Sequence, residues 1–170
     1  MPLRPLIYEA FTYYDREILP YKNDDVINAH AMPGAHAALQ AVQDAGLRCA
    51  LFTNPSFPQG AIECRMGWGD LADAPFELVT HMGNATRCKP DATYYLEQLQ
   101  AMGLEPHEVL MVGNDPKRDF PSPACGIQTA YVGQGKPGLA TWRGTMEDFA
   151  RDFNAVVEAF YEHQVADELS

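Results

Sequence analysis

The hydrophobic and polar positions of this chain follow two alternating patterns. Short apolar runs, typical of buried strands, occur at 47–53 (LRCALFT), 76–80 (FELVT), 108–112 (EVLMV) and 127–132 (IQTAYV), the last of which is predicted to be the final strand. Between them, apolar residues three or four positions apart predict helices over 33–46, about 58–68 and 89–103. A last amphipathic helix is predicted by the spacing of Met146, Phe149, Phe153, Val156, Val157 and Phe160. Strands that alternate with helices predict an α/β fold, with a parallel sheet covered by helices on both faces.

The N-terminal segment allows two interpretations. Residues 5–19 place Leu6, Ile7, Ala10, Phe11, Tyr14 and Ile18 about four positions apart, which favours a helix over the alternation of a strand. The stretch LIYEAFTYYD within this segment has two apolar residues and then a carboxylate, so a degenerate catalytic strand is the alternative. Residues 20–32 are polar and irregular, and Pro33 opens the next helix.

Composition narrows the class of protein. The chain has 170 residues, enough for one domain, and its 46% hydrophobic and 21% charged content is typical of globular proteins. No apolar run approaches a membrane span and no secretion signal is visible, so we expect a cytoplasmic protein without membrane contact. The cysteines form no CxxC pair and are interpreted as reduced thiols rather than disulfides or a zinc site: Cys49, Cys64, Cys88 and Cys125.

The net charge of −11 is concentrated near the C-terminus. Residues 145–170 contain one basic residue, Arg151, and seven acidic ones: Glu147, Asp148, Asp152, Glu158, Glu162, Asp167 and Glu168. Such a surface repels phosphate backbones, which argues against nucleic-acid binding. We interpret the acidic residues as a solvated helix face, with a specific cationic partner as the alternative.

Three polar features follow the predicted strands or open the next helix. Thr53-Asn54 ends LRCALFT, Lys89-Pro90 opens the helix after FELVT, and VGNDPKRD after EVLMV contains Asn114, Asp115 and Asp119. The carboxyl ends of parallel strands share one edge of a sheet, so these groups are expected to meet. A hydroxyl, an ammonium and paired carboxylates suit phosphoryl transfer, because the first two neutralise phosphate oxygens and carboxylates bind Mg²⁺.

Each feature alone has an ordinary structural explanation. Thr-Asn-Pro after a strand is a common turn, and a Lys before Pro is most often a solvated helix start. Asp115 and Asp119 could be a helix N-cap and a surface acid. The order and placement of all three together are far more specific than any one of them.

These segments resemble the haloacid dehalogenase-like (HAD) hydrolase superfamily. PGAHAALQAVQDAGLRCALFTNP resembles the approach to its second motif, with Thr53 as the motif Thr, and Lys89 matches the third-motif Lys. LMVGNDPKRDF resembles the fourth motif, in which Asp119 and either Asp115 or Asn114 would be metal ligands. The resemblance implies a three-layer Rossmann-like fold, a Mg²⁺ cofactor and a small phosphorylated substrate. It implies catalytic roles for Thr53 and Lys89, and substrate binding by Thr53, Asn54 and Lys89.

The sequence departs from this family in its first motif, DxDx(T/V), whose first Asp is the nucleophile and whose second is the acid/base. No DxD precedes Thr53, and LIYEAFTYYD would place Glu9 and Phe11 at those two positions. Phe cannot transfer a proton, and the longer Glu would misplace its carboxylate. The helical interpretation instead makes this stretch resemble the last helix of a cap domain.

The expected domain organisation follows from that departure. Residues 1–32 are interpreted as the remnant of a helical cap and its linker, and 33–170 as the HAD-like core. The middle strand of the family's sheet would be missing, so we expect one of three arrangements. Upstream residues carry DxD, or a partner chain or a second copy completes the sheet, or the sheet has closed up and the activity is lost. The chain is interpreted as a phosphohydrolase family member with impaired catalysis. The alternative is a non-catalytic domain that binds a partner or a phosphorylated ligand.

Overall fold

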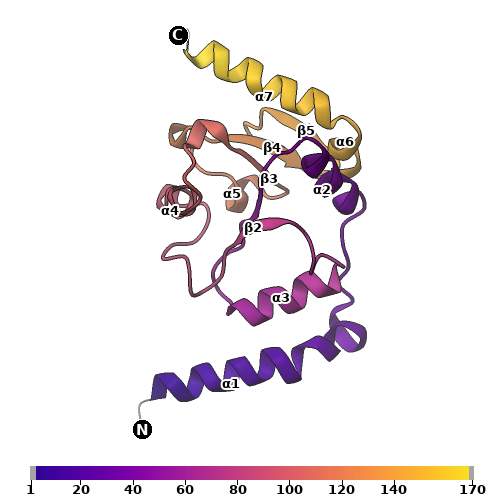
Figure 1. The fold of residues 1–170 in the computed structure, drawn as a ribbon, viewed down its shortest axis with the longest axis vertical. Helices are drawn as coiled ribbons and strands as arrows, with labels where there is room; N and C mark the ends of the chain where they lie inside the picture. The colour runs from indigo at the N-terminus through magenta and orange to yellow at the C-terminus, as the bar shows by residue number, and fades with distance from the viewer. Residues whose placement is uncertain (1–2, 169–170) are drawn as a thin grey trace.

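The computed structural model describes residues 3–168, and Figure 1 shows strands and helices alternating through most of them. The strands are β1 (Cys49–Leu51), β2 (Phe76–Val79), β3 (Leu110–Gly113), β4 (Gln128–Val132) and β5 (Trp142–Gly144). The α-helices are α1 (Leu3–Glu17), α2 (Ala35–Asp44), α3 (Gln59–Trp68), α4 (Ala92–Met102), α5 (Pro116–Asp119), α6 (Met146–Arg151) and α7 (Phe153–Glu168). The predicted mixed α/β architecture is therefore confirmed.

The described strands form two parallel sheets instead of the expected single sheet. β1 pairs with β2, and β3, β4 and β5 pair in that order, with Leu110 opposite Gln128 and Ala130 opposite Trp142. Within the described residues β1 has no strand on its other side, and neither does β3. The division lies between β1 and β3, where the resemblance described above implies the middle strand of the family's sheet.

The larger sheet is covered on one face by α2, α6 and α7. Successive strand residues point to opposite faces, so Leu110 and Val112 of β3 lie on this side, together with Ala130 and Val132 of β4. They pack against Ala38 of α2, and against Phe149, Phe153 and Val156 of the C-terminal helices. The Phe149 ring stands edge-on to Trp142 with centroids 5.5 Å apart. These contacts make the larger of the two clusters of buried apolar residues.

The opposite face of the larger sheet is covered by α4. Tyr94, Tyr95 and Leu99 are almost fully buried and pack with Ile127 and with Met111 of β3. Phe52, which directly follows β1, joins the same cluster, and its ring lies edge-on to Tyr94 with centroids 5.9 Å apart. Through α4, the end of the small sheet is therefore packed against the large one.

Local signals explain where the helices begin and end. Asp91 caps α4 by accepting a hydrogen bond from Thr93 N at 2.8 Å, and Gly103 ends it at a φ of 66°. Gly34 precedes α2 at a φ of 86°, and a Cβ there would lie 2.6 Å from Glu147 N. Glycine at this position thus lets the N-terminus of α2 approach α6 closely.

The structure corrects two predictions at the C-terminal end. IQTAYV is not the last strand, because the three-residue strand β5 pairs in parallel with β4. A strand this short, with an exposed central residue, leaves no clear periodic signal. The single final helix is divided at Asp152 into α6 and α7, and Thr145 caps α6 through a reciprocal hydrogen bond with Asp148.

The N-terminal segment is the helix α1, which excludes the catalytic-strand interpretation of LIYEAFTYYD. It lies at the opposite end of the molecule from α7 and packs against α3 (Figure 1). The predicted irregular stretch after it contains short helical turns at Leu19–Tyr21 and Asn23–Ile27. All four cysteines are free thiols. No helix among the described residues is long and apolar enough to cross a membrane.

Candidate functional site

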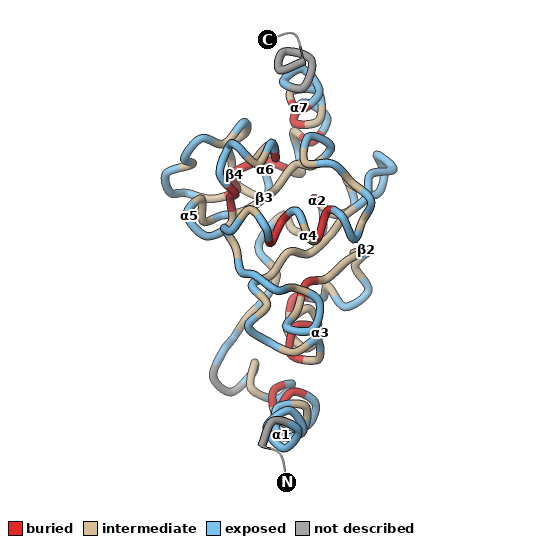
Figure 2. Tube along the Cα trace, turned by 90° about the vertical axis from the view of Figure 1, so that its left-hand side faces the viewer, coloured by how far each residue is buried: buried red, intermediate tan, exposed pale blue. Residues whose placement is uncertain are grey.

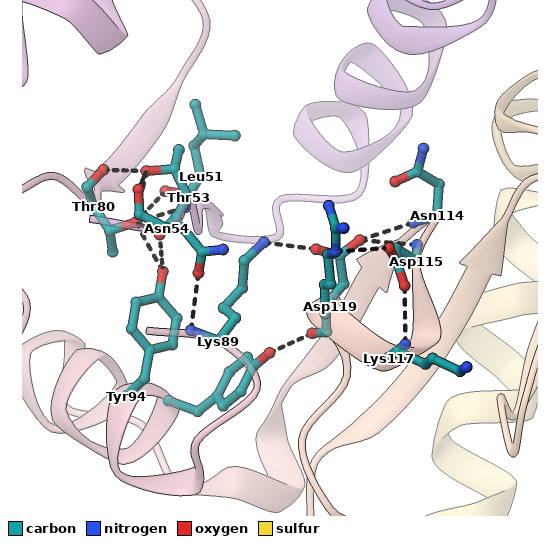
Figure 3. A network of polar contacts seen from close by, with 12 residues as sticks. Leu51, Thr53, Asn54, Thr80, Lys89, Tyr94, Asn114, Asp115, Lys117 and Asp119 are labelled. Carbon is teal, nitrogen blue, oxygen red and sulfur yellow. Dashed lines mark hydrogen bonds and ion pairs between the residues drawn. The ribbon is translucent and has the colours of Figure 1, made fainter. Parts of the chain in front are cut away.

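Lys89 connects the ends of the two sheets. Its backbone N–H donates to Asn54 Oδ1 at 2.9 Å, beyond the end of β1, and its Nζ donates to Asp119 Oδ1 at 2.8 Å, after β3 (Figure 3). Only 10% of the Lys89 side chain and 16% of the Asp119 side chain are exposed. Screening by water is therefore limited, which strengthens the attraction within this ion pair.

The loop after β3 is folded around the Asp119 carboxylate. Asp119 Oδ2 accepts hydrogen bonds from Asn114 N at 3.2 Å and from Asp115 N at 3.0 Å. The Tyr95 hydroxyl donates to the backbone oxygen of Asp119. A Cβ at Gly113 would lie 2.7 Å from Asp119 Cβ, so glycine is required for this close approach. Both oxygens of Asp119 are thus engaged by groups of the chain itself.

Asp115 and Asn114 have different surroundings from Asp119. Asp115 caps the short helix α5, with Oδ1 accepting from Lys117 N at 3.1 Å, and its Oδ2 lies 3.4 Å from Arg118 Nε. Asn114 is exposed. The ordinary interpretation of Asp115 as an N-cap therefore describes its present contacts, whereas Asp119 is a partly buried ion-pair partner and not a surface acid.

Thr53 is held by Thr80, a residue that sequence reasoning missed. Thr53 N donates to Thr80 Oγ1 at 2.6 Å, and Thr53 Oγ1 donates to the Thr80 carbonyl at 2.7 Å. Tyr94 Oη donates to the Thr53 carbonyl at 2.6 Å and lies 2.9 Å from Thr80 Oγ1. Burial raises the pKa of Tyr94 to about 12, so this hydroxyl stays protonated at neutral pH. A threonine at the end of each of two adjacent strands was the signal available in the sequence.

The structure brings most of the predicted residues into one network. Asn54, Lys89 and Asp119 are joined by direct hydrogen bonds, and Asn114 and Asp115 reach Asp119 through their backbone N–H groups. Thr53 precedes Asn54, but its hydroxyl faces the carbonyls of Thr80 and Asn54 rather than the Lys89 ammonium. The Thr53 proton must leave these carbonyls before it can be donated to a ligand.

The oxygen donors at the end of β3 suit Mg²⁺ chemically but are few. Mg²⁺ is usually held by one or two carboxylates together with phosphate oxygens and water, which Asp119, Asp115 and Asn114 could match. The described residues contain no group of three or more His, Cys, Asp or Glu side chains placed to hold a metal. Because Lys89 also neutralises Asp119, metal binding by these residues alone is expected to be weak.

A hollow of about 370 Å³ adjoins Thr53 and Asn54 on the side of α3. Its walls are mostly apolar and include Leu51, Phe57, Ile62, Met66 and Leu71. The Arg65 guanidinium also lines it and lies 3.8 Å from the centroid of the Phe57 ring. The end of β1 is thus open on the α3 side.

Comparisons with known proteins agree with the family resemblance. The family of haloacid dehalogenase-like hydrolases matches residues 3–125. A phosphoglycolate phosphatase of Rhodospirillum rubrum is 30% identical over 120 residues, which is 71% of this chain and 48% of the relative. A phosphoglycolate phosphatase of Nitrosospira multiformis is 24% identical over 161 residues, 95% of this chain and 66% of the relative. The chain therefore spans between about half and two thirds of the length of these relatives.

Solved structures show the same fold at lower identity. A HAD phosphatase from Thermococcus onnurineus superposes with a TM-score of 0.59 at 20% identity, over 72% of this chain and 57% of that one. A β-phosphoglucomutase from Clostridium difficile superposes with a TM-score of 0.62 at 16% identity, over 79% of this chain and 58% of that one. These likenesses concern the fold alone.

Proposed function

Because the chain belongs to the haloacid dehalogenase-like hydrolases, we propose that the network around Lys89 binds the phosphate group of a small phosphate monoester. The observation that carries this proposal is the Lys89 Nζ–Asp119 Oδ1 contact of 2.8 Å, which joins the ends of the two sheets beside Asn54. An ammonium with limited exposure, next to amide and hydroxyl donors, is suited to neutralising phosphate oxygens.

Each proposed residue has a distinct task. Lys89 retains donor hydrogens besides the one given to Asp119, and these would hold a phosphate oxygen. Asn54 Oδ1 accepts from Lys89 N, which leaves the Nδ2 donor for the same ligand. Thr53 would add its hydroxyl once that group releases Thr80. Asp119, together with Asp115 or Asn114, would hold Mg²⁺, which when bound supplies positive charge against the phosphate oxygens.

We further propose that these 170 residues bind the ester with little or no hydrolysis. The family's reaction needs a carboxylate nucleophile and a second carboxyl as acid/base, and the sequence contains no DxD. Asp119 is a poor substitute because both its oxygens are already engaged. Glu9 is exposed on α1, a helix that packs against α3 and not at the strand ends.

The second candidate function is that of a competent hydrolase, in which a strand from outside the described residues completes the sheet. β1 and β3 each have only one neighbouring strand within the described range, so a parallel strand placed between them would complete the sheet. In this proposal residues 1–32 are the remnant of a cap and linker, and 33–170 the core. The names of the two phosphatase relatives make 2-phosphoglycolate the first ester to test.

Phosphate binding is tested by thermal unfolding with inorganic phosphate and MgCl₂. A ligand at about ten times its Kd stabilises the folded state by roughly 1.4 kcal/mol, which should raise Tm by about 3–5 °C. Lys89→Met should abolish the shift, whereas Lys22→Met, in the turn after α1, should retain it. An unchanged shift in Lys89→Met, or no shift in the wild type, would overturn the proposed site.

Hydrolysis is tested by release of inorganic phosphate from 2-phosphoglycolate and p-nitrophenyl phosphate with Mg²⁺. We expect no turnover above that of Lys89→Met. Turnover that requires both Lys89 and Mg²⁺ would show that the chain is a competent enzyme, and would contradict the proposed impairment while supporting the site.

A further inference from the structure

We propose that the hollow beside Thr53 and Asn54 takes the organic part of the phosphate ester, and that Arg65 binds a carboxylate carried on it. The ligand class is thus a phosphate monoester of a small hydroxy acid. This inference rests on the proposed phosphate site and deepens it by naming the group next to the phosphate. The helix that supplies Arg65, α3, has buried residues and lies between α1 and the strands (Figure 2).

The hollow and the proposed phosphate site share two residues. Thr53 and Asn54 line the hollow, and Asn54 Oδ1 also accepts the hydrogen bond from Lys89 N at 2.9 Å. A ligand whose phosphate lies beside Lys89 and Asn54 therefore has this hollow next to it. The volume of about 370 Å³ is at the small end of the roughly 300–1,000 Å³ of small-molecule sites, which suits a short organic group.

The cation in the wall of the hollow is Arg65. Its Cζ lies 3.8 Å from the centroid of the Phe57 ring, which belongs to the same wall. This contact uses the face of the ring and consumes none of the N–H donors of the guanidinium. Within the residues that the structure describes, Arg65 forms no ion pair. A half-buried guanidinium with unused charge therefore lies at the edge of the phosphate site.

One acidic side chain of the protein acts on Arg65 from α1. Burial raises the pKa of Asp15, which is 5% exposed, against the opposing effect of the Arg65 charge. The two groups do not approach as an ion pair, and Asp15 Oδ2 accepts no hydrogen bond from any described residue. Asp15 therefore attracts Arg65 without occupying its donors, which remain available to the carboxylate of a ligand.

The chemistry of the hollow favours a carboxylate over other second groups on the ester. The fork of a guanidinium matches a carboxylate through two parallel N–H···O bonds. A second phosphate would bring about 1.5 to 2 negative charges against this single cation. Sugar hydroxyls would face walls that are mostly apolar and would lose hydrogen bonds to water without replacing them. These walls are formed by Leu51, Phe57, Ile62, Met66 and Leu71.

Isothermal titration calorimetry with Mg²⁺ tests the proposal, using 2-phosphoglycolate and ethyl phosphate, which differ in the carboxylate. The wild type should bind 2-phosphoglycolate about 10–100-fold more tightly, as expected for hydrogen bonds to a charged group. Arg65→Met should remove this difference without changing the Kd of ethyl phosphate. Arg65→Lys should restore only part of it, because an ammonium lacks the planar fork. Arg143→Met, at an exposed position of β5, is the matched control and should behave as the wild type.

The NMR signal of the Arg65 Nε–Hε group locates the carboxylate. It should shift on addition of 2-phosphoglycolate and stay in place with ethyl phosphate. Equal affinity for the two esters in the wild type, or an undiminished preference in Arg65→Met, would overturn the role of Arg65 and leave the phosphate site standing. Absence of Lys89-dependent binding of either ester would instead overturn the phosphate site, and this inference with it.

Discussion

The two sheets of this protein differ in that only the larger one contains a strand with buried residues, its central strand β4. In the larger sheet Ala130, Tyr131 and Val132 of β4 are buried, because β4 has a strand on each side and helices on both faces. No residue of β1 or β2 is buried to this degree, and the same holds for β3 and β5; each of these four strands has only one neighbour among the described residues. Strands with similar apolar sequences are therefore buried to different depths, because burial depends on how many neighbouring strands and helices the tertiary structure places around each one.

The candidate site lies between these unequal regions. Asn54 and Thr53 belong to the end of the smaller sheet, and Asp119 to that of the larger one. The residues of α4 and those just before it, such as Tyr94 and Lys89, make contacts to both. The position of the site residues relative to one another thus depends on a few side-chain contacts and not on a continuous sheet. The following substitutions test this difference, from the largest expected effect to the smallest.

The largest difference is expected in the free energy of unfolding when one apolar side chain of each region is replaced by alanine. Phe149→Ala should lower the free energy of unfolding by about 3–5 kcal/mol, because Phe149 is 4% exposed in the core of the larger sheet. Leu51→Ala in β1, half-buried beside the hollow, should lower it by about 1 kcal/mol. Urea unfolding of both variants measures this, and equal losses would contradict the comparison.

Thr80→Val should disturb the link between the regions. The substitution keeps the shape of the side chain but removes the hydroxyl that accepts from Thr53 N, leaving that partly buried N–H unpaired. A loss of about 1–3 kcal/mol in unfolding free energy is expected, with weaker phosphate binding because Thr53 is displaced. Thr93→Val near the start of α4 is the matched control, and an equal effect there would refute the role of Thr80.

The Lys89–Asp119 pair should be energetically coupled across the two regions. A double-mutant cycle of Lys89→Met and Asp119→Asn, measured by urea unfolding, should give a coupling energy of about 1–2 kcal/mol. The pair between Arg118 and Asp115 is far more exposed, at 80% and 43% of its side chains, and should give less than about 0.5 kcal/mol. Equal coupling energies would mean that Lys89 does not hold the regions together.

The smallest effect should be a pH dependence of the α1–α3 contact. Burial raises the pKa of Asp15, whose Oδ2 has no hydrogen-bond partner among the described residues, against the opposing influence of Arg65. The folded state thus prefers the protonated acid, and stability is lost as pH rises from the unfolded pKa near 3.8 through the raised folded value. Asp15→Asn should therefore raise Tm at pH 7 but not at pH 3, whereas Asp73→Asn, an exposed control, should change Tm at neither.

Much of the fold could be predicted because its signals are local. The apolar period of residues 5–19 distinguished a helix from a strand, and the apolar runs located β1 to β4 within a few residues. The strand β5 was not predicted because its three residues carry no periodic signal. The polar groups at the strand ends were also visible in the sequence, because parallel strands place their carboxyl ends on one edge. Thr80 and Tyr94 were missed because their importance arises from contacts between residues far apart in the chain.

The sequence by itself predicted most of the order of helices and strands and a resemblance to family motifs around Thr53, Lys89 and Asp119, and it contains no DxD pair within these 170 residues. Such features depend on residue type and near-neighbour spacing, which the chain encodes locally. Only the tertiary structure decided that the strands form two sheets, that Thr53 faces Thr80, and that Lys89 pairs with Asp119. These outcomes depend on which strand edges and side chains meet across long sequence separations, and local periodicity carries no information about that.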